Sequence, residues 1–362
     1  MKKRAILVDG NNLLFRSYYA TAYNGNLMKN SKGIPTNALY GFINMINKII
    51  NEEKPEYMMI AFDKGHNFRK DLYKEYKDGR NETPSDLKVQ FPIAKELCTL
   101  MGIKYIEIDN YEADDIIGTF ARMADEDKNY NATIVSSDKD LLQLISDEVD
   151  VKLLKQKDYV WMNKNTFFET YGLEPIKMID LKSLMGDASD NIPGVKGIGE
   201  KTALSLLQKY GSLDGVYSHI DEISGKTKET LINDKESAYF SYKIATIYKN
   251  IDFEYTFDDI KYDGPKSNEL IEYEHFYCDP IISIYVHDPV TDECAIEGET
   301  HVTITSTYFH DTHVVVFDYY IADNGEYIRI VSPDFSKSAN RLREDFEARY
   351  PFQFEKNHSY CS

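Results

Sequence analysis

The sequence is poor in several features that mark specialised classes of protein. Its 362 residues include four cysteines, which form no Cys-x-x-Cys pair and follow no regular spacing. Neither a disulfide framework nor a zinc site is therefore indicated. No apolar run approaches the roughly 20 residues that a membrane-spanning helix needs. We expect a globular protein of the reducing cytoplasm, with no membrane partner.

Positive charge is also scarce, with 42 Lys and Arg against 60 Asp and Glu and a formal net charge of −18. This balance argues against a nucleic-acid partner, because phosphate binding draws on Lys and Arg. The deficit is concentrated, however: residues 251–362 hold 8 Lys and Arg against 23 Asp and Glu, whereas the first 250 residues hold 34 against 37. The first 250 residues are thus nearly neutral, and a nucleic-acid partner stays open for them.

Short apolar runs and helical patterns alternate along the first part of the chain. Four runs predict buried strands: AILVD (5–9), YMMIAFD (57–63), IKYIEI (103–108) and ATIVSSD (132–138). Between them, stretches such as NALYGFINMINKII (37–50) and DDIIGTFARMA (114–124) carry apolar residues at helical spacing. Strands that alternate with helices predict an α/β fold with a doubly wound, mainly parallel sheet.

The rest of the chain changes character twice. From about 163 to 250 the pattern is helical, apart from the glycine-rich stretch DASDNIPGVKGIGEKTA (187–203). Beyond residue 251, three runs predict a small antiparallel β region: HVTITSTYF (301–309), HVVVFDYYIA (313–322) and EYIRIV (326–331). The Asn-Gly pair between the last two predicts a hairpin turn, and we expect a short helix over 339–350.

Acidic side chains follow the predicted strands. Three strands end in an aspartate, and the fourth leads into a helix that begins with three acids: Asp9, Asp63, Asp138, Glu112, Asp114 and Asp115. In an open parallel sheet, ligands bind beyond the carboxyl ends of the strands, so we expect these side chains at one crevice. Asp140, Asp187 and Asp190 complete a set of nine candidates.

This set suits divalent cations, because hard cations such as Mg²⁺ take oxygen ligands. Phosphodiester hydrolysis with two metal ions needs several carboxylates, since the ions activate a water molecule and stabilise the leaving oxygen. Each acid alone has a structural alternative, as a residue favoured by a helix dipole, a helix cap or a turn residue. Convergence favours the metal site, because capping does not predict that one strand after another ends in an acid.

Five stretches of the sequence resemble a known family. They are LVDGNNLLFRSYYA (7–20), FDKGHNFRKDLYKEYKDGR (62–80), YEADDIIGTFAR (111–122), SSDKDLLQL (136–144) and LMGDASDNIPGVKGIGEKTA (184–203). Their order and spacing are similar to those of the bacterial 5′ nucleases. These are flap endonuclease-like 5′-3′ exonucleases, found as the N-terminal domain of DNA polymerase I and as free-standing proteins. The resemblance covers roughly the first 250 residues and ends near 265, so we expect the free-standing form.

The resemblance implies three regions. Residues 1–165 would be a PIN-like nuclease domain with a helical arch at about 64–92. Residues 166–264 would be a helical subdomain with a helix-hairpin-helix-like DNA-binding element at about 187–210. Residues 265–362 form an unrecognised acidic, β-rich region, for which we consider a structural cap, a protein-interaction module or an acidic mimic that limits DNA access.

The resemblance also divides the nine acids between two Mg²⁺ or Mn²⁺ ions. Asp9, Asp63, Glu112, Asp114 and Asp115 match the more tightly held cluster. The second ion would be served by Asp138, Asp140, Asp187 and Asp190.

Basic residues of the arch match the family's phosphate-binding element. Lys77 and Arg80, in YKDGR, would act at the scissile phosphate, where positive charge offsets the charge that develops there. Tyr76 offers a face for base stacking, and Arg16 and Arg69 are carried over as further DNA contacts. The structural alternative is an ordinary solvated, charged helix.

The glycine-rich stretch resembles the family's helix-hairpin-helix-like element. Its residues expected to grip the duplex backbone are Gly194, Lys196, Gly197, Gly199, Lys201 and Thr202. Exposed backbone N–H groups before a helix suit a phosphate, and the resemblance adds a K⁺ ion. A plain turn between helices is the alternative.

We therefore expect a monomeric, structure-specific 5′ nuclease that acts on 5′ flaps, 5′ ends or RNA primers in replication and repair. Two other functions stay open. One is a DNA-junction binding protein whose acids hold metal for structure only. The other is a PIN-type ribonuclease acting on single-stranded RNA.

Overall fold

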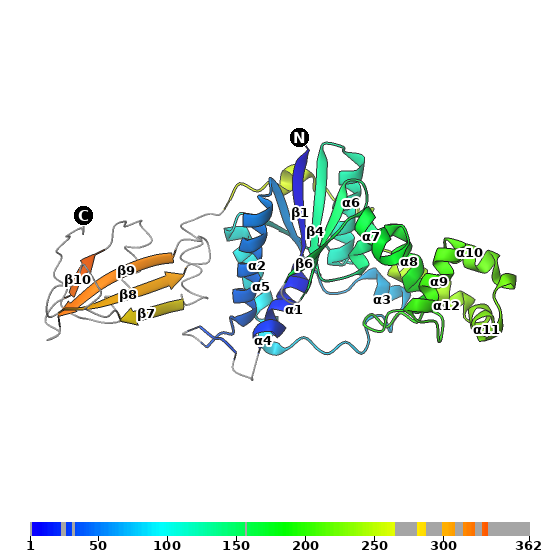
Figure 1. The fold of residues 1–362 in the computed structure, drawn as a ribbon, viewed down its shortest axis with the longest axis horizontal. Coiled ribbons are helices and arrows are strands. Elements are labelled where there is room, and N and C mark those ends of the chain that lie inside the picture. The colour runs from blue at the N-terminus through cyan, green and yellow to red at the C-terminus, as the bar shows by residue number, and fades with distance from the viewer. Residues whose placement is uncertain are drawn as a thin grey trace.

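The computed structural model describes residues 2–22, 27–30, 33–155 and 158–264, together with four strands between residues 281 and 331. A six-stranded sheet with the order β3-β2-β1-β4-β5-β6 forms the centre of the first part (Figure 1). Its strands are β1 (Lys3–Asp9), β2 (Tyr57–Ala61), β3 (Lys104–Ile106), β4 (Tyr130–Ser136), β5 (Val149–Leu154) and β6 (Tyr159–Met162). All neighbours pair in parallel except β5 and β6. The predicted doubly wound, mainly parallel α/β sheet is confirmed.

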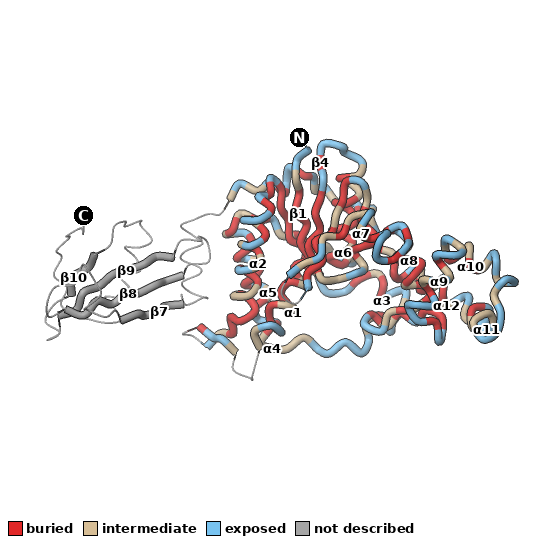
Figure 2. Tube along the Cα trace, viewed as in Figure 1, coloured by how far each residue is buried: buried red, intermediate tan, exposed pale blue. Residues whose placement is uncertain are grey.

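Side chains of β1 alternate between two cores, so this strand is buried on both faces (Figure 2). Ile6 and Val8 pack in the core formed with three helices on one face. Ala5 and Leu7 belong to the core on the other face, where α6 (Ala113–Glu126) lies. The three helices of the first face are α1 (Gly10–Thr21), α2 (Asn37–Glu53) and α5 (Gln90–Leu100). A strand buried on both faces needs a continuous apolar run, which AILV supplies.

The strand order reverses between β1 and β4. The chain leaves β1 through α1 and α2 to reach β2 on one side, and it returns from β3 through α6 to β4 on the other side. This reversal opens a crevice beyond the carboxyl ends of the two strands, where doubly wound sheets bind ligands.

A long connection follows β2 and passes below the sheet in the view of Figure 1. It contains α3 (Phe68–Leu72) and α4 (Ser85–Lys88). Asn67 caps α3, because its side chain accepts hydrogen bonds from the backbone N–H groups of Arg69 and Lys70. Between the two helices the chain turns, and Lys77 adopts a positive φ of 60°.

Helices dominate the chain after β6. They are α7 (Lys164–Tyr171), α8 (Met178–Met185), α9 (Glu200–Tyr210), α10 (Leu213–Ser218), α11 (Gly225–Asn233) and α12 (Lys235–Ala245). The described 3₁₀ helices are short: Asp140–Leu144, Pro175–Lys177, Ile220–Glu222 and Phe257–Ile260. The glycine-rich stretch connects α8 to α9, as its composition predicts.

Four further strands form an antiparallel sheet in the order β10-β9-β8-β7. They are β7 (Ile281–Val286), β8 (Glu299–Thr307), β9 (Val314–Ala322) and β10 (Ile328–Val331). The last three confirm the predicted strands, whereas β7 was not predicted. The expected Asn-Gly turn and the helix over 339–350 lie outside the described residues.

Every helix in the part of the chain that the structure describes is too short or too polar to cross a membrane.

Candidate metal centre and nucleic-acid interface

The end of β1 delivers Asp9 to the crevice. Its side chain caps α1, because Oδ1 accepts a hydrogen bond from the Asn12 N–H at 3.0 Å, and Oδ2 accepts one from the Ser136 hydroxyl at 2.9 Å. Burial raises the pKa of Asp9 to about 7, and the nearby charges of Asp63 and Asp138 add to this rise against those hydrogen bonds. Asp9 is thus held rigidly beside the carboxylates from two neighbouring strands.

Asp63 follows β2 and ties that strand to the start of α6. Its Oδ1 accepts a hydrogen bond from the Ala113 N–H at 2.8 Å, and its Oδ2 accepts one from the Asn11 amide at 3.1 Å. Burial raises the pKa of Asp63, with Lys77 opposing the rise and Glu112 adding to it. The ends of β1 and β2 therefore present two hydrogen-bonded carboxylates to the same space.

Glu112 and Asp114 enter this space from the N-terminus of α6. Glu112 accepts hydrogen bonds from the Asn67 amide at 3.0 Å and from the Tyr76 hydroxyl at 3.0 Å, and it pairs with the Lys77 ammonium. The pKa of Asp114 is raised well above its usual range by burial, then by repulsion from Asp138 and Asp9. An acid in this position favours an added cation.

A second group of acids surrounds Asp138, which follows β4. Asp138 Oδ1 accepts a hydrogen bond from the Asp140 N–H at 2.9 Å. Burial raises the pKa of Asp140 to about 7, Asp138 adds to the rise and Lys182 opposes it. Asp187 also pairs with Lys182, and the resulting hydrogen bonds, with those from Ser189, lower its pKa despite burial.

Asp190 contacts residues of the long segment that follows β2. Arg80 pairs with its carboxylate, Tyr76 donates a hydrogen bond to Oδ2 at 3.2 Å, and the Lys77 N–H donates to its carbonyl oxygen at 2.9 Å. The pKa of Lys77 is raised, because attraction to Glu112 and Asp190 outweighs burial. Lys77 and Arg80 thus lie within the acid cluster.

The donor set fits divalent cations in its chemistry. It consists of carboxylate oxygens, the ligands that Mg²⁺ and Mn²⁺ prefer, and burial with mutual repulsion leaves Asp9 and Asp114 short of positive charge. Within residues 2–22, 27–30, 33–155 and 158–264, no three His, Cys, Asp or Glu side chains are already grouped around one metal position. Lys77, Arg80 and Lys182 occupy places between the acids instead.

Two family descriptions match the chain in tandem. The N-terminal resolvase-like domain of 5′-3′ exonucleases matches residues 4–172, and the C-terminal SAM fold of 5′-3′ exonucleases matches residues 173–268. The chain belongs to the 5′-3′ exonuclease family. The resemblance seen in the sequence is confirmed.

Similar proteins include two bacterial DNA polymerases. DNA polymerase I of Bacillus caldotenax is 45% identical over 275 residues, which are 75% of this chain and 31% of the relative. DNA polymerase I of Bacillus subtilis is 42% identical over 274 residues, with the same shares of 75% and 31%. The chain thus spans about a third of the length of these relatives.

Two solved structures share the fold. The 5′-exonuclease of bacteriophage T5 with bound divalent zinc has a TM-score of 0.56 and 22% identity, covering 68% of this chain and 90% of that one. The catalytic core of Rad2 in complex with a DNA substrate has a TM-score of 0.54 and 19% identity, covering 76% and 88%. The expected fold class is confirmed.

Asp115 differs from its expected role as a metal ligand in this 5′-3′ exonuclease. Its two oxygens accept hydrogen bonds from the Arg69 guanidinium at 2.7 Å each, from the Glu112 N–H at 3.0 Å and from the Tyr248 N–H at 2.8 Å. A carboxylate offers about four acceptor sites, and all four are used. Glu112 also accepts four hydrogen bonds, but one of its donors is the partly exposed Lys77 ammonium, whereas the donors to Asp115 are the buried Arg69 and two backbone N–H groups. We therefore assign Asp115 to holding the start of α6 in place rather than to metal binding.

Arg69 likewise does not reach a DNA surface, contrary to expectation. It is 3% exposed, and its five N–H donors are spent on Asp115, Glu112 and the carbonyl oxygens of Ile244 and Thr246. Its role is to tie α3 to α6 and to the end of α12.

Tyr76 is also 3% exposed, and its hydroxyl bonds to Glu112 and Asp190. A ring without an accessible face cannot stack on a base, so the expected stacking role is corrected to one that positions these two acids.

The turn between α8 and α9 is partly open. Gly197 and Gly199 are exposed, and a Cβ atom at either position would meet nothing within 4 Å, so their backbone is accessible. Lys196, Lys201 and Thr202 are exposed beside them. Gly194 is different, because it is buried and packs so closely on Gly186 that a Cβ atom would lie 2.2 Å from the Gly186 nitrogen.

Arg16 does not join the acids. It lines a cavity of about 110 Å³ between α1, α2 and the β5–β6 edge, together with residues that include Lys48, Lys152 and Tyr159. Acidic Glu52 and Asp158 line the same cavity, so Arg16 lies in a mixed-charge environment away from the acid cluster.

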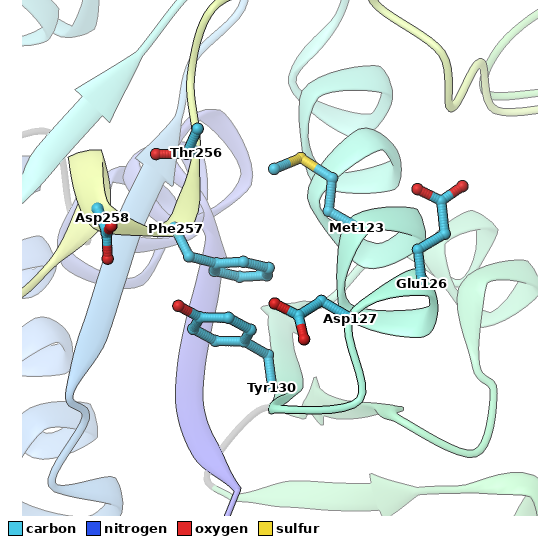
Figure 3. Close-up of a pocket in the computed structure, with 7 residues that line it drawn as sticks. All are labelled: Met123, Glu126, Asp127, Tyr130, Thr256, Phe257 and Asp258. Carbon is cyan, nitrogen blue, oxygen red and sulfur yellow. The ribbon is translucent and has the colours of Figure 1, made fainter.

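A second group of acidic side chains lies at the C-terminal end of α6. A pocket of about 440 Å³ is lined by Met123, Glu126, Asp127, Tyr130, Thr256, Phe257 and Asp258 (Figure 3). Its three acids are exposed, and its rings of Tyr130 and Phe257 stack at 4.0 Å. Tyr130 begins β4, so this pocket lies at the amino edge of the sheet, away from the crevice.

Several residues of the site were not predicted from the sequence. Asn11, Asn12 and Asn67 orient the acids or their backbone, and Lys182 bridges two of them. The pair Asn11-Asn12 directly after Asp9 was an available signal. For Lys182 the sequence offered only a weak signal, namely its position five residues before Asp187.

Proposed function

We propose that this chain is a metal-dependent, structure-specific 5′ nuclease that hydrolyses phosphodiester bonds at 5′ flaps, 5′ ends or RNA primers. The observation that carries the proposal is the meeting of Asp9, Asp63, Asp114 and Asp138 at the switch point of the sheet, next to Lys77 and Arg80. Membership of the 5′-3′ exonuclease family supports it. So do the names of two fold neighbours, one with bound divalent ions and one with a DNA substrate.

The acids would hold two Mg²⁺ or Mn²⁺ ions in two groups. Asp9, Asp63, Glu112 and Asp114 would hold one, and Asp138, Asp140, Asp187 and Asp190 would serve the other. Bound divalent cations would supply a lowered pKa for the attacking water and would offset charge on the phosphate.

The chain's own cations would act on the phosphate directly. Lys77 and Arg80 lie among the acids, so they are placed to donate hydrogen bonds to phosphate oxygens and to stabilise the negative charge that develops there. Tyr76, Asn67 and Asn11 would keep the carboxylates oriented while these cations change partners.

The open turn between α8 and α9 would hold the duplex. Exposed backbone at Gly197 and Gly199, with Lys196, Lys201 and Thr202 beside it, suits phosphate groups and would allow a K⁺ ion to bind. Such contacts position DNA without reading its sequence.

The proposed division of labour follows the expected regions. Residues 1–165 would carry the chemistry, 166–264 the duplex contacts, and 265–362 a structural or protein-binding role. The monomeric state and the cytoplasmic location stay predictions.

Cleavage of a labelled 5′-flap duplex in Mg²⁺, with a chelator control, tests the proposal. We expect products cut near the junction, carrying a 5′-phosphate and lost on chelation. Binding without products would favour a junction-binding protein. Preferential cleavage of single-stranded RNA in the same substrate panel would favour a PIN-type ribonuclease.

A further inference from the structure

One largely buried lysine beside the acids, Lys182, has no part in the proposed function. Lys182, on α8, lies with its Nζ 2.6 Å from Asp140 Oδ1 and in hydrogen-bond contact with Asp187 Oδ2. The three side chains are only 12–14% exposed. A single ammonium group therefore bridges two carboxylates that come from different elements.

The surroundings direct both carboxylates to this ammonium. Asp187 Oδ1 accepts hydrogen bonds from the Ser189 N–H at 2.8 Å and the Ser189 hydroxyl at 2.6 Å, which leaves Oδ2 to face Lys182. Asp140 begins the 3₁₀ helix after β4, and its N–H is fixed by Asp138. The Lys182 ammonium thus occupies the point at which the two acids converge.

A divalent cation cannot share that point with the ammonium group. Mg²⁺ requires its oxygen ligands at about 2.0–2.1 Å, and two cations so close to each other would repel strongly at the low effective dielectric of a buried site. An ion bound between Asp140 and Asp187 must therefore displace Lys182 and break both of its contacts.

We propose that Lys182 is a built-in competitor of the second divalent ion, which makes the two metal positions unequal. The inference rests on the proposed function and extends it. The position near Asp9, Asp63 and Asp114 fills first, and the position at Asp140 and Asp187 fills only when Lys182 withdraws. Lys182 is thus a positioning residue that sets the metal concentration at which the second ion binds.

Metal binding by the full chain, measured without DNA, tests this inference. Free Mn²⁺ is followed by electron paramagnetic resonance during titration of the wild type, Lys182→Met and Lys182→Arg. Lys152→Met is the matched control, because Lys152 also bridges two carboxylates, Glu52 at 2.5 Å and Glu53 at 2.8 Å, away from the acid cluster.

We expect Lys182→Met to tighten the weaker class of Mn²⁺ sites by roughly tenfold or more, in line with the removal of a close like charge. The stronger class should stay unchanged, and Lys182→Arg and Lys152→Met should both resemble the wild type. Circular dichroism of each variant ensures that folded protein is compared.

Two results would overturn the inference. If folded Lys182→Met binds the second ion as the wild type does, or more weakly, Lys182 does not compete with metal. If the wild type binds no Mn²⁺ and cleaves no 5′ flap in the same preparation, the proposed function fails as well. Flap cleavage with an unchanged Lys182→Met isotherm removes only the inference.

Discussion

The two ends of α6 carry similar acids but differ in what surrounds them. At the N-terminal end, Glu112 and Asp114 face the crevice, and Asp115 binds Arg69 and the Tyr248 N–H. At the C-terminal end, Glu126 and Asp127 are exposed beside the pocket of Figure 3. Acid content alone therefore does not identify a metal centre.

The two ends of α6 differ because they lie at opposite edges of the sheet. The N-terminus of α6 lies where β1, β2 and β4 end, so acids from three strands meet it and burial raises the pKa of Asp9, Asp63 and Asp114. The C-terminus of α6 lies at the amino edge, where no parallel strand ends. The helix dipole adds to the difference, because it favours acids at the N-terminus only.

The loss of one crevice carboxylate should have the largest effect on the rate of flap cleavage. We expect Asp114→Asn to slow flap cleavage in Mg²⁺ by at least about a thousandfold, since it removes a carboxylate from the crevice. The matched change at the other end of α6, Asp127→Asn, should alter the rate by less than about twofold. Single-turnover assays of both variants measure the contrast. An Asp114→Asn variant that cleaves as fast as the wild type would contradict the proposed difference between the two ends of α6.

Lys77→Ala should slow the same step by about 10²–10³-fold, because a cation near the reacting phosphate is lost. Lys88→Ala is the control, since Lys88 lies on α4 and pairs with exposed Glu82. If both variants cleave at equal single-turnover rates, Lys77 is only a partner of Glu112.

The ion pairs at the two ends of α6 should differ in their effect on stability. Arg69→Met leaves Asp115 buried without its partner and should lower the free energy of unfolding by about 3–5 kcal/mol. Arg122→Met removes a pair with the more exposed Glu126 and a hydrogen bond to the Lys249 carbonyl oxygen, and should cost about 1–2 kcal/mol. Urea unfolding of both variants gives the two values, and equal losses would contradict the comparison.

The crevice acids could be predicted because their position follows from strand order. Apolar runs located the strands, and parallel pairing sends the ends of those strands to one edge, so Asp9, Asp63 and Asp138 needed no further information. Asp114 followed from its place at the start of the helix that crosses that edge.

The burial of Arg69 and Asp115 could not be predicted from the local sequence pattern. FRKDLYKEY resembles a solvated helix, yet Arg69 is buried through contacts with Asp115 and with the carbonyl oxygens of Ile244 and Thr246, far along the chain. Likewise, Asp114 and Asp115 are neighbours in sequence, but successive helix positions point in different directions. The four hydrogen bonds to Asp115 appear only in the folded structure, where Arg69, the Glu112 N–H and the Tyr248 N–H surround it.

The most direct test of the central claim is the binding of Mn²⁺ to the full chain, compared between Asp114→Asn and Asp127→Asn. We expect Asp127→Asn to bind as the wild type does, and Asp114→Asn to weaken the strongest class of sites by at least about tenfold. An unchanged isotherm for Asp114→Asn would contradict it, because the acids at the switch point would then not be the metal centre.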